Sequence, residues 1–143
     1  MTALTLATAN AIIEAAFAKA AELKLRPLGV SVLDAGGHLI AFQRQDGASL
    51  LRPQMSAGKA FGALAIGMGS RRLQGFAVEY PYLVSGISDV SQRGIVPVAG
   101  GVLIRDEAGA ILGAVGISGD HMDNDEAAAI AGIEAAGFKA DGG

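Results

Sequence analysis

The 143-residue sequence contains no cysteine. Disulfide bonds, thiolate nucleophiles and cysteine metal sites are therefore excluded. Charged residues make up only 17 % of the chain and the formal net charge is −3, which is not the basic footprint of a nucleic-acid-binding protein. No apolar run reaches the roughly 18 residues that a membrane span needs, and the N-terminus lacks the basic segment of a signal peptide. These absences predict a cytoplasmic protein that binds neither nucleic acid nor membranes.

Apolar and small residues are abundant instead. Hydrophobic residues make up 51 % of the chain, and 21 residues are glycine. A chain of this length buries a core without disulfides, and we expect one domain over residues 1–143. With so few charges to cover its surface, we expect copies of the chain to bury part of that surface in a homo-oligomer.

Two pairs of apolar runs predict two β-hairpins. Each pair flanks a short segment with aspartate and glycine, which are typical turn residues between strands. The runs are residues 28–33 and 38–44 around Asp34-Ala35-Gly36-Gly37, and residues 102–104 and 110–117 around Asp106-Glu107-Ala108-Gly109. The last run is apolar at almost every position, which predicts a central strand covered on both faces. Its glycines, Gly113 and Gly116, are expected to admit a neighbouring helix or subunit.

Helices are predicted before, between and after the hairpins. Apolar residues at three- and four-residue spacing indicate a first helix over residues 5–25, capped by Thr5. Pro53 suits the first turn of a second helix that ends near residue 67, and Ser70 is the expected cap of a third that ends at Pro81.

The later segments give weaker patterns. Residues 82–94 indicate turns or a short helix, and residues 95–98 an extended segment or an edge strand. The last helix is expected over residues 123–136, with Asp123 and Glu126 as its capping pair, followed by a frayed tail. Hairpins between helices imply an antiparallel sheet covered by helices, which is an α+β layered domain.

Two histidines are candidate ligands. His121 and Met122 form an adjacent pair of residue types that bind haem iron, within an acidic loop that runs from Asp120 to Glu126. Carboxylates at a helix N-terminus are favoured by the helix dipole, so we interpret this loop as helix capping and predict no metal site. His38 follows the turn of the first hairpin, where a histidine is either a solvated turn residue or a ligand.

Four charged residues lie close together in the sequence around the start of the second predicted helix. They are Arg44, Asp46, Arg52 and Lys59. Arginine and lysine bind carboxylates through charge-assisted hydrogen bonds, so this group is a candidate site for an organic anion or a propionate. A salt-bridged surface or a subunit contact explains the same residues equally well.

Six motifs along the chain occur together in a known family. They are Val32 to Leu39, Arg44 to Ala48, Lys59-Ala60, Val96 to Gly101, Gly113 to Asp120, and Asp125-Glu126. In these motifs the chain resembles the GlcG/HbpS family of haem-binding proteins, which is also similar to the C-terminal domain of PduO-type cobalamin adenosyltransferases. The resemblance implies a five-stranded antiparallel sheet with helices on both faces (a profilin-like layered domain), oligomeric assembly and haem binding.

Two functional hypotheses follow. The first is a small-molecule binding protein that holds haem or a related tetrapyrrole and has an accessory or sensing role in catabolism. Its predicted contacts are His38, Arg44, Lys59, His121 and Met122. The second is a small lyase, hydrolase or isomerase that acts on an organic acid. Its predicted residues are Arg44, Asp46, Arg52, Gly101 and Ser118 for the substrate, and Lys59, Asp120 and His121 for catalysis.

Overall fold

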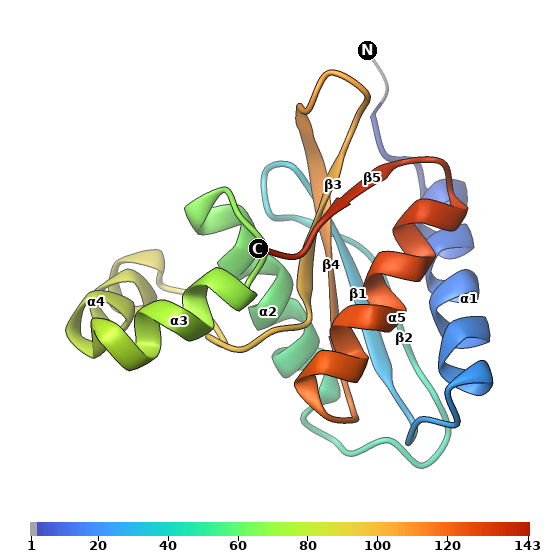
Figure 1. Ribbon diagram of the computed structural model, residues 1–143, viewed down its shortest axis with the longest axis horizontal. Coiled ribbons are helices and arrows are strands. Elements are labelled where there is room, and N and C mark those ends of the chain that lie inside the picture. Colours follow the sequence, from blue (N-terminus) through green and yellow to red (C-terminus); the bar gives the residue numbers. More distant parts are fainter. Residues whose placement is uncertain (1–2) are drawn as a thin grey trace.

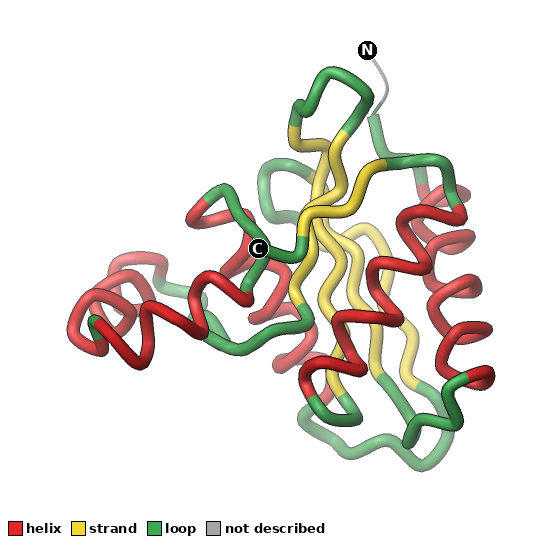
Figure 2. Tube along the Cα trace, viewed as in Figure 1, coloured by secondary structure: helices red, strands yellow, loops and turns green. Residues whose placement is uncertain are grey.

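The computed structural model describes residues 3–143 as a five-stranded antiparallel sheet with helices on both faces (Figure 1; Figure 2). The predicted α+β fold is confirmed. In chain order the elements are α1 (Leu6–Glu22), β1 (Gly29–Asp34), β2 (Leu39–Arg44), α2 (Arg52–Ile66), α3 (Arg71–Glu79), α4 (Pro81–Ser91), β3 (Gly101–Arg105), β4 (Ile111–Ser118), α5 (Met122–Ala135) and β5 (Lys139–Asp141). Within the described residues, no helix combines the length and apolar character needed to cross a membrane.

The sheet has the strand order β2-β1-β4-β3-β5, so β4 is its central strand, as predicted. Both predicted hairpins are present, as β1–β2 and β3–β4. The carboxylate of Asp34 organises the first turn because it accepts hydrogen bonds from the backbone N–H groups of Gly36 and His38, each at 2.9 Å. Gly37 adopts φ +83°, a conformation that favours glycine.

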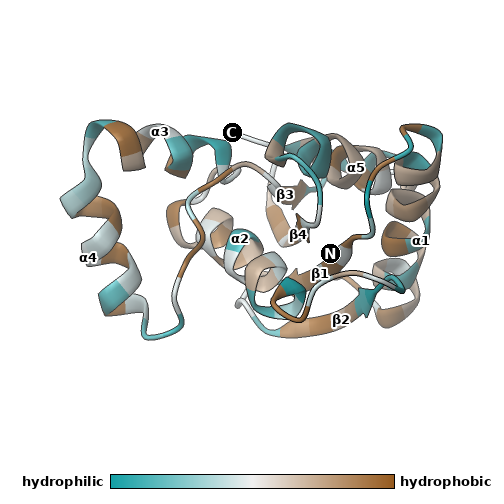
Figure 3. Ribbon diagram, turned by 90° about the horizontal axis from the view of Figure 1, so that it is seen from below, coloured by the Kyte–Doolittle hydropathy of each residue, from teal (hydrophilic) through white to brown (hydrophobic). Residues whose placement is uncertain are grey.

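Two layers of helices enclose the sheet. Helices α1 and α5 pack on one face over the larger core, and α2 packs on the other face over a smaller core (Figure 3). The apolar stripe predicted for α1 is buried at Ala9, Ile13 and Ala20, whereas Leu6 at the start of the helix is exposed. Thr5 caps α1 as predicted, since its side chain accepts the N–H of Thr8 at 3.1 Å.

Glycine in the central strand allows α2 to approach the sheet closely. A Cβ atom on Gly116 would collide with the backbone carbonyl of Ser56 in α2. The prediction that this glycine admits a helix is therefore correct. Gly58 and Gly62 on α2 serve a different contact, because Cβ atoms there would lie 2.7 Å from side-chain atoms of Val96 and Leu73.

One prediction between the hairpins is wrong, and another holds in only one of its two forms. Ser70 precedes α3 but does not cap it, because its hydroxyl accepts the N–H of Gly101 at 2.7 Å and donates to the carbonyl of Val98 at 2.6 Å. Of the two forms predicted for residues 95–98, the edge strand is absent, since the N–H of Val96 donates to the carbonyl of Gly58 in α2. The Ser70 hydroxyl and the Val96 N–H both bond to residues distant in the sequence, which local sequence patterns do not reveal.

The C-terminal tail is also ordered differently from the prediction. Instead of fraying, Lys139–Asp141 pairs with β3 at the edge of the sheet. Arg105 of β3 reinforces this pairing through an ion pair with Asp141 at 2.9 Å. Residues 82–94 were expected as turns or a short helix, and residues 82–91 belong to the eleven-residue α4, which starts at Pro81.

Replacing Gly116 with alanine should destabilise the protein by about 3 kcal/mol or more, because the new methyl group has to displace the α2 backbone. The matched control is Gly75→Ala in α3, where an added Cβ meets no atom within 4 Å. That change should stabilise the helix by about 0.5–1 kcal/mol. Urea unfolding measures both. Equal effects of the two substitutions would contradict the close contact between α2 and β4.

Candidate functional site

The predicted site residues lie at two opposite ends of the sheet. His38 belongs to the β1–β2 turn, next to Asp34 at the end of β1. At the start of β1, Gly29 pairs with Arg44 on one side and with Ser118 on the other. The six residues of β1 separate the two ends by roughly 17 Å. We call them the His38 end (Asp34 and His38) and the Arg52 end (Arg44, Arg52 and Ser118), and they cannot form one compact site.

Lys59 lies beneath the Arg52 end and is buried. Its Nζ atom donates to a carboxylate oxygen of Asp125 at 3.1 Å and to the carbonyl of Ile117 at 2.9 Å. The two side chains are 3 % and 1 % exposed. Burial lowers the pKa of Lys59 and raises the pKa of Asp125, because removal from water disfavours both charges. Lys59 thus joins α2, β4 and α5 and offers no exposed group to a ligand.

Gly101, a predicted substrate contact, is likewise covered. It is buried, and a Cβ atom there would collide with the backbone of Lys59. Its N–H and carbonyl are both satisfied by Ser70. The residue therefore contributes to the packing of α2 on the sheet.

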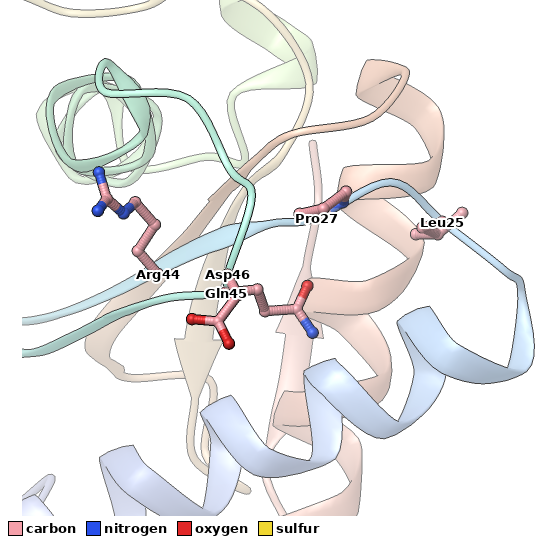
Figure 4. A pocket seen from close by; sticks show the side chains of 5 residues that line it. All are labelled: Leu25, Pro27, Arg44, Gln45 and Asp46. Carbon is pink, nitrogen blue, oxygen red and sulfur yellow. The ribbon is translucent and has the colours of Figure 1, made fainter.

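Arg52, at the first turn of α2, is partly buried. Its Nη1 atom donates to the hydroxyl of Ser118 at 2.7 Å, while its Nε atom is buried without a hydrogen-bond partner. The positive charge of Arg52 also contributes to the lowered pKa of Lys59. Arg44 is exposed beside a hollow of about 520 Å³ that Asp46 also lines (Figure 4). Within residues 3–143, neither Arg44 nor Arg52 forms an ion pair.

The acidic loop organises the start of α5. Asp120 accepts hydrogen bonds from the side chain of Asn124 and from the backbone N–H groups of Arg26 and His121. These bonds, that of Asn124 foremost, hold the pKa of Asp120 well below its usual range. Asp120 is thus an ionised structural group and a poor proton donor. No cluster of three histidine or acidic side chains suited to a metal ion is found in residues 3–143.

The predicted capping pair of α5 is wrong. The side chains of Asp123 and Glu126 both pair with Arg71 of α3, at 2.6 and 3.0 Å. The cap is His121, whose Nδ1 atom accepts the N–H of Asp123 at 3.2 Å. Met122 begins the helix directly after this cap.

The surroundings of the two histidines favour different free nitrogens. Because Nδ1 of His121 accepts a hydrogen bond, the neutral ring carries its proton on Nε2, which then has no lone pair for a metal. Nδ1 of His38 lies 3.2 Å from a carboxylate oxygen of Asp34. The nearby carboxylate favours the neutral tautomer with its proton on Nδ1, which leaves the Nε2 lone pair free. This carboxylate–histidine arrangement is typical of metal-binding histidines.

The His38 end also has a largely apolar hollow of about 490 Å³. Its lining residues are Ala3, Leu4, Asp34, Ala35, Gly36, His38, Ile111 and Leu112. The His38 side chain is 80 % exposed. The hydrogen bond from the backbone of His38, foremost, lowers the pKa of Asp34 and keeps this carboxylate ionised. Residues 3–4 and 111–112 were not predicted as site residues because they are distant from His38 in the sequence and lie beside it only in the folded chain.

The family model for "Haem degrading protein HbpS-like" matches residues 4–134. The chain belongs to the HbpS-like family. The predicted resemblance is thereby confirmed. A Citrobacter freundii protein of 15.0 kDa, uncharacterized and encoded between dhaT and dhaS, is 33 % identical over 122 residues, which cover 85 % of this chain and 84 % of that protein.

Solved structures of similar proteins agree with this assignment. A PduOC complex with haem has a TM-score of 0.83 and 26 % identity, and the match covers 96 % of this HbpS-like chain and 97 % of the other. A double mutant of Streptomyces reticuli HbpS has a TM-score of 0.81 and 29 % identity, covering 94 % and 88 %. Klebsiella pneumoniae ORFY has a TM-score of 0.81 and 26 % identity, covering 95 % and 92 %.

Replacing Lys59 with methionine should destabilise the protein by about 3–5 kcal/mol at neutral pH, because the carboxylate of Asp125 loses its buried partner. The raised pKa of Asp125 means that the folded variant holds a proton that the unfolded chain releases above about pH 4. Its stability should therefore fall as the pH rises from 5 to 8. Urea unfolding across this range measures the effect.

Adding Asp125→Asn to Lys59→Met should abolish this pH dependence, because an asparagine side chain does not titrate. Its amide oxygen can still accept the hydrogen bond from the N–H of Asp120 that Asp125 accepts at 2.9 Å. The control is Lys139→Met, at an exposed lysine, which should change stability by less than about 0.5 kcal/mol. A loss below about 1 kcal/mol in Lys59→Met, independent of pH, would contradict the buried pair.

Proposed function

We propose that this HbpS-like protein binds haem or a related tetrapyrrole. The observation that carries the proposal is the similarity, over 96 % of the chain, to PduOC, a protein solved in complex with haem. Membership of the HbpS-like family supports it. The accessory or sensing role in catabolism and the cytoplasmic location stay predictions.

We place the proposed ligand at the His38 end. The free Nε2 lone pair of His38 suits an axial ligand to iron, and the carboxylate of Asp34 would orient the ring and increase its basicity. The apolar hollow beside it, which includes Leu4 and Ile111, suits one edge of a porphyrin ring. Bound haem would supply a redox-active iron. In this arrangement Arg44, Lys59, His121 and Met122 would not contact the haem, because they lie at or near the other end of the sheet.

We also propose that the protein is a homo-oligomer whose copies meet at the arm formed by α3 and α4. This arm projects from the sheet beyond α2 (Figure 1). It carries large apolar side chains that are at least half exposed: Val78, Tyr80, Tyr82, Leu83 and Val90. A second copy of the same arm would cover them symmetrically. The low charge content of the chain supports burial of this surface between copies.

A haemin titration followed by absorbance tests the ligand and its site. The wild-type protein should give a saturable Soret shift. His38→Ala should abolish the spectrum of a histidine-ligated haem, and Asp34→Asn should weaken binding by about tenfold or more because it removes the orienting carboxylate. His121→Ala is the matched control and should retain the spectrum. Loss in His121→Ala with an unchanged His38→Ala would place the ligand elsewhere.

Light scattering after size exclusion tests the assembly. Tyr82→Glu and Val90→Glu should shift the protein toward smaller species, because each places a charge in an apolar contact. The control is Leu50→Glu, since Leu50 is 77 % exposed and lies outside the arm. That variant should keep the wild-type mass. A monomeric wild type, or an equal effect of Leu50→Glu, would rule out assembly through the arm.

A further inference from the structure

The Arg52 end brings two arginines together on the α2 side of the sheet. Arg44, Gly29 and Ser118 are paired across β2, β1 and β4, so their side-chain positions face the same way. A Cβ atom on Gly29 would lie 2.7 Å from Cβ of Arg52, which shows that Arg52 sits directly above this glycine. Arg44 extends toward α2 from the neighbouring strand (Figure 4). The two arginine side chains therefore start within roughly 8 Å of each other.

One edge of the Arg52 guanidinium has no acceptor. Ser118 takes the hydrogen bond of Nη1 and holds the group in place. Nε and Nη2 form the opposite edge, and within residues 3–143 neither has a hydrogen-bond partner. An unpaired buried N–H costs free energy. Two parallel N–H groups match the two oxygens of a carboxylate, which pairs with arginine in this bidentate geometry.

The charges around this edge are not balanced by the protein. Asp125 pairs with Lys59, and Asp120 is held by Arg26 and Asn124. Asp46 lines the same hollow as Arg44 but lies beyond ion-pair distance of it. The first turn of α2 has no acidic residue and no side-chain cap, so the helix dipole adds to the positive potential. The unpaired edge of Arg52 therefore lies in a region of positive potential.

We infer that the Arg52 end binds a small organic carboxylate, with Arg52 as its bidentate partner and Arg44 as a second cation nearby. Ser118 acts as a positioning residue because it fixes the guanidinium. The site lies at the opposite end of the sheet from His38, so it is separate from the proposed haem site. It does not depend on that proposal. Two cations whose side chains start within roughly 8 Å of each other favour a dicarboxylate over a monocarboxylate.

Isothermal titration with malonate at low ionic strength tests this inference, with acetate and inorganic phosphate as comparison anions. Malonate should bind the wild-type protein saturably, and more tightly than acetate or phosphate. Arg52→Gln and Arg44→Gln should each weaken malonate binding by about tenfold or more, the loss expected for one charge-assisted hydrogen bond. The control is Arg72→Gln, which removes the same charge from an exposed arginine of α3 and should change affinity by less than about twofold.

Several results would overturn the inference: no saturable binding, equal weakening by Arg72→Gln, or phosphate bound as tightly as malonate. Arg44 is exposed, so Arg44→Gln tests the site even if Arg52→Gln fails to fold. Repeating the titration with haemin-saturated protein separates a free acid from a haem propionate, which share the same chemistry. Unchanged malonate affinity is expected; displacement by haemin would assign the site to propionates. If haemin does not bind at all, malonate binding should still be seen.

Discussion

The contact between α2 and the central strand β4 is the constraint on which the rest of the structure depends. It exists because Gly116 has no side chain, which lets the α2 backbone lie against the sheet. Lys59 of α2 extends across this contact and pairs with Asp125 at the start of α5. Two buried charges are costly to remove from water, but their mutual pairing and further hydrogen bonds offset that cost. The same pair therefore fixes the positions of α2, β4 and α5 together.

This constraint also determines what the Arg52 end of the sheet presents, while a separate turn shapes the other end. At the Arg52 end, the close approach of α2 places Arg52 over Gly29 and beside Ser118, with one guanidinium edge unused. Because α5 begins directly after His121, the Nδ1 atom of this residue caps the helix, and its lone pair is not available to a metal. At the other end, His38 projects from a hairpin turn that Asp34 organises, and its lone pair stays available. One sheet thus carries a candidate anion site and a candidate haem ligand that do not overlap.

Local signals were sufficient for most of the fold. The hairpin turns depend on aspartate and glycine within four residues, and α1 depends on a stripe and a cap, so both were predictable. Three features depend on partners distant in sequence and were not. Asp123 and Glu126 pair with Arg71 and so do not cap α5. Strand β5 forms only by pairing with β3. Lys59 is buried where it pairs with Asp125, which lies 66 positions later in the sequence. The site prediction joined two ends of the sheet because spacing along the chain does not show which end of a strand a residue occupies.

The proposed division between the two ends is tested most directly by NMR with gallium(III) protoporphyrin, a diamagnetic analogue of haem. The backbone amide shifts of the ¹⁵N-labelled protein would be followed during titration. Ligation by His38 predicts that the largest changes occur at residues 34–38 and 111–112, while residues 118–124 around His121 stay nearly unchanged. Changes confined to residues 118–124, with the β1–β2 turn unaffected, would contradict the proposed site.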